Sequence, residues 1–137
     1  MLPGPLSGVS VHYIVESGKS FHEATVDLEA VVPRLGFVIL HAHDLGDALR
    51  GKDIDFDDEC KVFEVGNYRQ MEKMLAADLR LSLALPWRIS VFTENGATKI
   101  GLLRPAGLLA LLFPSGDVAR LAGELEEKAI QIVDETR

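Results

Sequence analysis

The sequence predicts an α+β fold, a single domain with a largely antiparallel sheet and helices on one face. Three observations predict it. Short β-rich runs alternate with amphipathic helical patterns, one strong hairpin signal joins two of the runs, and the chain has the length of one ordinary domain. Its 137 residues include 47% hydrophobic and 26% charged side chains, as in most globular proteins. We expect residues 1–10 to form a flexible N-terminal arm and residues 11–137 to form the domain.

A strand and a long helix are predicted at the start of the domain. Residues 11–15 are rich in β-branched and aromatic side chains, which favour a strand. Ser20 stands three residues before Glu23, the reciprocal capping pair that opens a helix. Apolar side chains then recur at helical spacing as far as Leu35, and Gly36 is a suitable C-terminal cap.

The middle of the chain predicts two strands, a polar segment and a second helix. Residues 37–42 are apolar enough for a strand that is buried on both faces along most of its length. An acidic segment over residues 44–59 follows, with one helical turn near its start. Residues 61–65 alternate cleanly and predict the next strand. Asn67 opens a helix that continues to residue 83.

The last third contains the clearest local signal. Asn95 and Gly96 stand between two β-rich runs, residues 88–93 and 98–103, and both turn residues tolerate a positive φ. A short helix is expected from Pro105 to Phe113. A long amphipathic helix, capped by Asp117, completes the chain.

Composition excludes several classes of function. The net charge of −7 argues against nucleic acid, because phosphate backbones are bound by clustered Lys and Arg side chains. The most hydrophobic run, residues 100–113, is interrupted by Arg104 and is shorter than the ~20 apolar residues of a spanning helix. The single cysteine cannot form an intramolecular disulfide, which suits a reducing compartment. We therefore expect a soluble cytoplasmic protein that binds neither nucleic acid nor membrane.

Two histidines are candidate metal ligands. His41 and His43 lie two residues apart on a predicted strand, so their side chains share one face and can chelate a metal jointly. Protein zinc sites have three or four ligands, and the sequence fixes no third one nearby. The interpretation that we favour is a strand end at which an imidazole satisfies a loop carbonyl.

Two further motifs are rejected as functional sites. Acidic residues from Asp53 to Glu64 occupy positions one, three, five and twelve of a calcium loop, but Asp58 stands where the turn needs glycine. A solvated acidic loop is the better interpretation. Cys60 follows Glu59 and has no partner cysteine and no identified base, so structural burial is favoured over a reactive thiolate.

Apolar and aromatic side chains predict a binding surface. Trp87, at the start of a strand, is expected to pack in the core, with a pocket or a dimer seam as the alternative. The run from Gly107 to Phe113 is too apolar for a freely exposed helix, so it packs on the core or forms an oligomer interface. We expect a homodimer.

Several motifs in the same order resemble the domain-of-unknown-function 302 family, from about Tyr13 to Arg137. They are His43-Asp44-Leu45, Asp55-Phe56-Asp57, Glu59 to Val65, Asn67, Leu85-Pro86-x-Arg88-Ile89, and Thr98-Lys99-Ile100 with Pro105. The resemblance implies a compact, often dimeric α+β domain with a TATA-binding-protein-like β-α-β-β-β-β-α layout, and it supplies no activity. Members often carry cysteine where this chain has Gly66 and Trp87, so a thiol pair is not expected here.

Three classes of function remain open. The favoured one is a non-catalytic module that binds a small or hydrophobic ligand, or a partner, as a dimer. The second is a redox protein that binds haem or a transition metal through His41 or His43, with Met71 or Met74 as lesser ligands. The third is a small hydrolase or isomerase in which His43, Asp44 and Glu64 act as acid and base. The expected ligand-binding residues are His43, Asp44, Glu64, Asn67, Trp87 and Arg88.

Overall fold

The computed structural model describes residues 11–137, and the predicted N-terminal arm lies outside the described residues. The elements follow in the order β1 (His12–Ser17), α1 (Phe21–Arg34), β2 (Val38–Asp44), α2 (Leu45–Arg50), β3 (Cys60–Gly66), α3 (Tyr68–Ala77), the 3₁₀ helix η2 (Leu79–Leu83), β4 (Trp87–Glu94), β5 (Ala97–Leu103), α4 (Pro105–Leu112) and α5 (Gly116–Thr136). The predicted α+β class is confirmed.

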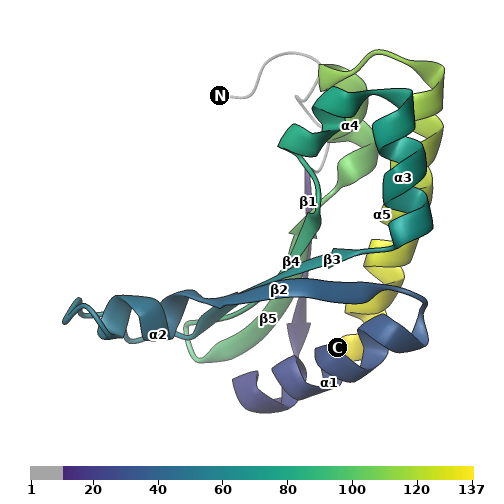
Figure 1. The fold of residues 1–137 in the computed structure, drawn as a ribbon. Helices are drawn as coiled ribbons and strands as arrows, with labels where there is room; N and C mark the ends of the chain where they lie inside the picture. The colour runs from purple at the N-terminus through teal and green to yellow at the C-terminus, as the bar shows by residue number, and fades with distance from the viewer. Residues whose placement is uncertain (1–10) are drawn as a thin grey trace.

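The five strands form one sheet in the order β1-β5-β4-β3-β2. Every neighbouring pair is antiparallel, so the largely antiparallel prediction holds throughout the described residues. The first strand in sequence pairs with the last, which places β1 and β2 at opposite edges (Figure 1).

Local sequence signals explain where the helices and the hairpin begin. Ser20 accepts a hydrogen bond from the backbone N–H of Glu23, and the Glu23 carboxylate accepts one from the N–H of Ser20. The hydrogen bond from the backbone N–H of Ser20 lowers the pKa of the Glu23 carboxyl below its ordinary value near 4.5. Asn95 and Gly96 both have a positive φ, at 52° and 81°, as the predicted turn requires.

The second predicted helix is divided in two. The expectation of one helix up to residue 83 is wrong, because α3 ends at Ala77 and η2 begins at Leu79. Asp78 lies between them with an extended backbone, and its carboxylate accepts a hydrogen bond from the backbone N–H of Arg80. A polar residue with this capping ability interrupts the helical pattern although the apolar spacing continues through it.

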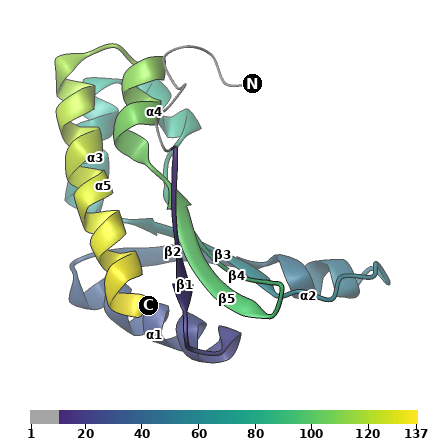
Figure 2. The same ribbon diagram turned by 180° about the vertical axis from the view of Figure 1, so that it is seen from behind.

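One face of the sheet carries the hydrophobic core. Side chains from alternate positions of the strands point into this layer and pack against α1 and α5. The largest fully buried side chains on the strands are Phe63, Ile89 and Ile100, and α5 adds Val118 and Ile132. The long helices α1 and α5 cover this one face, as predicted (Figure 2).

The second strand differs from its prediction. Burial on both faces was expected for residues 37–42, yet Leu40 and His41 are exposed and Val38 is half-buried. The strand lies at the sheet edge, where it has a neighbouring strand on one side alone. Apolar composition alone does not reveal whether a strand is central or at an edge.

Among residues 11–137, none of the helices has the length and apolar character needed to cross a bilayer.

Candidate functional site

An apolar cavity of about 520 Å³ lies on the open face of the sheet, the face away from α1 and α5. The sheet curves so that this face looks into the space between the end that carries α4 and the arm that carries α2 (Figures 1 and 2). The lining residues are His12, Ile14, Val62, Ala84, Trp87, Arg88, Ser90, Phe92, Gly101, Leu102, Leu103 and Leu108.

The floor of the cavity is a row of side chains across neighbouring strands. Ser90 on β4 lies opposite Val62 on β3 and Gly101 on β5, and Gly101 lies opposite Ile14 on β1. A Cβ atom at Gly101 would stand 2.8 Å from Cγ1 of Ile14 and 3.0 Å from the carbonyl oxygen of Tyr13. Glycine at this position therefore lets Ile14 lie close over the strand.

One end of the cavity is closed by η2, α4 and the indole of Trp87. Ala84 follows η2, Leu108 belongs to α4, and both line the cavity. Trp87 is 5% exposed, packs in the hydrophobic core, and its Nε1–H donates to the carbonyl oxygen of Leu103 at 2.7 Å. The indole thus contributes to the core and to the cavity wall together.

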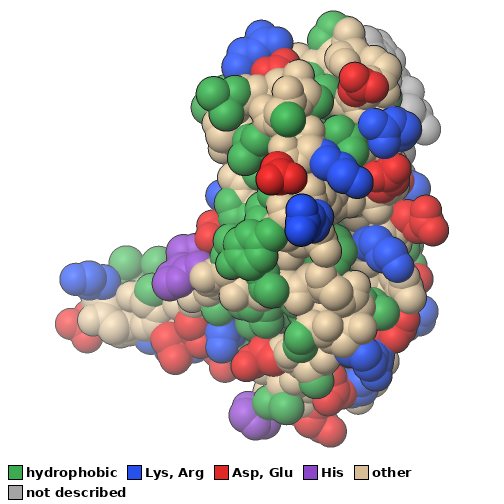
Figure 3. All heavy atoms as spheres, turned by 45° about the vertical axis from the view of Figure 1, so that its right-hand side comes forward, with side chains coloured by type: hydrophobic (Ala, Val, Ile, Leu, Met, Phe, Trp, Pro, Cys, Tyr) green, Lys and Arg blue, Asp and Glu red, His purple; other side chains and the backbone are tan. Residues whose placement is uncertain are grey.

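A polar row borders the cavity on the side of β2. His41, Glu64 and Arg88 lie directly opposite one another on β2, β3 and β4. Nε2 of His43 is 3.5 Å from Oε2 of Glu64, and NH2 of Arg88 is 4.0 Å from the same oxygen. Four predicted site residues therefore lie together. His43, Glu64 and Arg88 lie at this border, and Trp87 lies at the cavity wall. Figure 3 shows histidine beside hydrophobic side chains near the arm.

The predicted histidine pair shares one face, as expected from its spacing. The ring centroids of His41 and His43 are 4.4 Å apart in an edge-to-face arrangement. Glu64 is the adjacent carboxylate. Within residues 11–137, however, no three His, Cys, Asp or Glu side chains form a group that could hold a metal ion. Met74, one of the lesser ligand candidates, is fully buried in the core.

Two of the predicted ligand-binding residues cap helices instead of facing the cavity. The Asp44 carboxylate accepts from the N–H of Asp47 at the start of α2. Asn67 accepts from the N–H of Gln70 and donates to the carbonyl oxygen of Gly36 at 2.8 Å. Asn67 lines a separate, smaller cavity between the start of α3 and α5. The acid–base set His43, Asp44 and Glu64 is thereby divided, because adjacent strand residues point to opposite faces.

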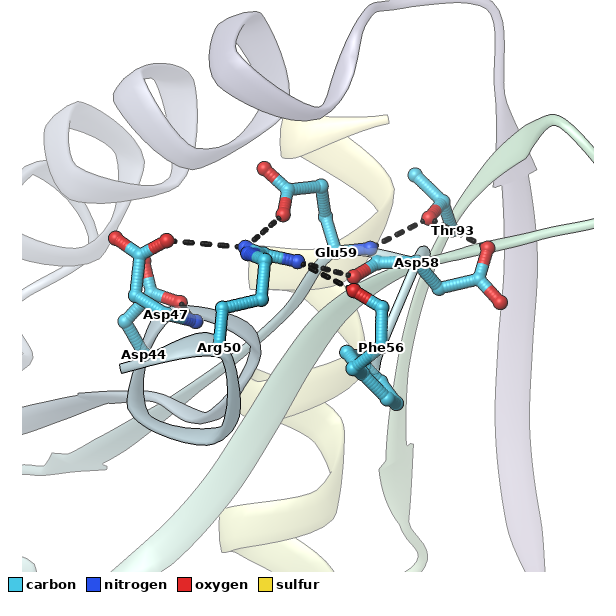
Figure 4. Close-up of polar contacts among 7 residues, drawn as sticks. All are labelled: Asp44, Asp47, Arg50, Phe56, Asp58, Glu59 and Thr93. Carbon is cyan, nitrogen blue, oxygen red and sulfur yellow. Dashed lines mark hydrogen bonds and ion pairs between the residues drawn. The ribbon is translucent and has the colours of Figure 1, made fainter. Parts of the chain in front are cut away.

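The acidic segment folds around a single arginine. NH1 of Arg50 donates to the carbonyl oxygens of Phe56 and Asp58, both at 3.0 Å, and NH2 donates to the carboxylates of Asp47 and Glu59 (Figure 4). Hydrogen bonds to the two carboxylates raise the pKa of Arg50. The segment is therefore an ordered arm organised by its own guanidinium, and Glu64 projects from β3 instead of closing a calcium loop.

We expect Arg50→Lys to loosen this arm without unfolding the domain. An ammonium group cannot reach two backbone carbonyls and two carboxylates in the fork geometry of a guanidinium. Hydrogen exchange measured by mass spectrometry should become faster in residues 51–59 and unchanged in α5. Arg69→Lys, at an exposed position of α3, is the matched control. Unchanged exchange in residues 51–59 of the Arg50 variant would contradict the assigned role.

Sequence reasoning missed most of the cavity lining. Ile14, Val62, Ser90, Phe92 and Leu103 come from four strands and become neighbours only through the strand order. The available sequence signal for the cavity was the alternation along residues 87–92, in which successive side chains point to the core and to the open face. Without the pairing of β1 with β5, that signal does not locate a site.

Comparisons with known proteins agree on one family. The model of the family described as "Domain of unknown function DUF302" matches residues 13–136. A crystal structure described as an uncharacterized conserved protein DUF302 from Bacillus stearothermophilus superposes with a TM-score of 0.89 at 26% identity, and covers 94% of this chain and 100% of that chain. The comparison with curated proteins found no match.

Proposed function

The chain belongs to the DUF302 family, a domain of unknown function, and from this premise we propose that it is a non-catalytic domain that binds a small hydrophobic molecule on the open face of its sheet. The apolar cavity of about 520 Å³ carries the proposal. Cavities of roughly 300–1,000 Å³ with apolar walls and a few polar groups are typical of small-molecule sites.

The chemistry of the lining favours binding over catalysis. The described residues that line the cavity are mainly aliphatic and aromatic, with Ser90, Arg88 and His12 as the polar ones. Catalysis needs a nucleophile and a base, or an acid and a base, within hydrogen-bond reach of one another. His43 and Glu64, whose Nε2 and Oε2 atoms are 3.5 Å apart, lie beside the cavity and not in its lining.

Dimerisation and a cytoplasmic location remain predictions of the sequence. In the run from Gly107 to Phe113, Leu109 and Phe113 pack in the core, while Leu111 and Leu112 are exposed. The run therefore packs on the core through two of its side chains, and its two exposed leucines are available for an interface. The mass of the native protein measured in solution will report whether it is a dimer.

The test of the proposed function is binding of a neutral dye, N-phenylnaphthylamine, which becomes fluorescent in apolar surroundings. The wild-type protein is expected to bind it at one saturable site. Ser90→Phe fills the cavity floor with a side chain that strands accept readily, so the domain should fold and its affinity for the dye should fall at least about tenfold. Ser82→Phe, on the exposed side of η2, makes the same change outside the lining.

Circular dichroism and the thermal midpoint show whether each variant is folded. Equal loss of dye binding in both, or no loss in Ser90→Phe, would show that the dye binds elsewhere and would overturn the proposal. Loss in Ser90→Phe alone supports it.

A further inference from the structure

The cavity has one permanently charged side chain in its described lining, and that charge is positive. Arg88 on β4 lies at the border between the apolar floor and the polar row of His41 and Glu64. Arg88 is part of the lining, yet its side chain is 64% exposed, so the guanidinium is accessible to water. Arginine commonly covers apolar surface with its methylene groups in this way.

The acidic neighbour of Arg88 does not occupy its donors. NH2 of Arg88 is 4.0 Å from Oε2 of Glu64, whereas charge-assisted N–H···O bonds are about 2.7–2.9 Å long. The same oxygen is nearer to Nε2 of His43, at 3.5 Å. The guanidinium therefore has donors available to an incoming acceptor, and its planar fork suits a carboxylate.

We infer that the ligand is an amphipathic anion, with an apolar body on the cavity floor and a carboxylate at the guanidinium of Arg88. The inference rests on the proposed function and adds the chemical class of the ligand. The apolar body lies over Ile14, Val62 and Phe92, which with Ser90 form the floor of the cavity. The complementary charge at one end then gives the ligand its orientation.

Three probes with the same alkyl chain separate the charge from the apolar contact. Decanoate, decanol and decylammonium are titrated into the native protein at neutral pH, at concentrations below micelle formation. Trp87 is the only tryptophan of the sequence and lines the cavity, so its fluorescence reports binding directly. The comparison uses Arg88→Gln, Arg88→Lys and, as a control outside the lining, Arg69→Gln.

The expected result is a selective loss. Arg88→Gln should weaken decanoate binding about fivefold to tenfold, which is the range of one exposed charge-assisted contact. Decanol binding should not change, decylammonium binding should not weaken, and Arg69→Gln should behave as wild type. Arg88→Lys should recover part of the affinity for decanoate, because it keeps the charge but loses the fork.

Failure of the inference can be distinguished from failure of the proposed function. Equal weakening of decanoate and decanol in Arg88→Gln would show a packing role for Arg88, and would overturn the carboxylate assignment while leaving the cavity as a binding site. Binding of decanol and the neutral dye without decanoate would do the same. If none of the three probes and no dye bind, both proposals are overturned.

Discussion

Trp87→Ala is expected to lower the free energy of unfolding by about 3–5 kcal/mol, as is usual when a buried aromatic side chain is truncated. The indole is 5% exposed, belongs to the core, and donates a hydrogen bond to the carbonyl oxygen of Leu103. The loss is a large part of the roughly 5–15 kcal/mol that stabilises an ordinary domain. Urea unfolding followed by far-ultraviolet circular dichroism measures it, since the variant has no tryptophan fluorescence.

The same variant should also lose affinity for the neutral dye, because the indole forms one wall of the cavity. Trp87→Phe is the matched variant. It keeps an aromatic ring but leaves the carbonyl oxygen of Leu103 without its donor, so a smaller loss of about 1–3 kcal/mol is expected. Unfolding of Trp87→Ala at the urea concentration of the wild type would show that the indole does not stabilise the core.

Phe63→Ala is expected to be equally destabilising, by about 3–5 kcal/mol, with a different consequence for binding. Phe63 is 1% exposed on β3 and points into the helical layer, away from the cavity. The neighbouring Val62 points to the open face and stays in place. At a temperature at which the variant is still folded, dye affinity should match that of the wild type.

The contrast between the two variants tests the division of the sheet into a core face and a binding face. Calorimetry or urea unfolding gives the stability of Phe63→Ala, and a dye titration of the folded fraction gives its affinity. A strong loss of affinity in folded Phe63→Ala would mean that the two faces are not independent. Such a result would contradict the assignment of the cavity to the open face.

The features that the sequence predicts well are those determined by neighbouring residues. The reciprocal hydrogen bonds of Ser20 and Glu23 span three residues, and the turn at Asn95 and Gly96 depends on two. The face shared by His41 and His43 follows from strand geometry alone. Local rules of this kind give the class and the number of strands.

The features that could not be predicted depend on pairing between distant segments. The exposure of Leu40 follows from the position of β2 at the sheet edge, and the cavity follows from β1 lying next to β5. Of the predicted ligand-binding residues, Trp87 and Arg88 line the cavity, and they are the first two residues of β4. Asp44 and Asn67 were predicted as ligand-binding residues because they are polar, but their side chains cap helices.

The alternation along β4 has a consequence for how this domain can change over evolutionary time. Trp87, Ile89 and Val91 point to the core, whereas Arg88, Ser90 and Phe92 line the cavity. Substitutions at the second set alter the ligand that is accepted while leaving the core intact, so one scaffold can diverge in specificity at little cost in stability. A library randomised at those three positions should accordingly contain many folded members with new binding preferences.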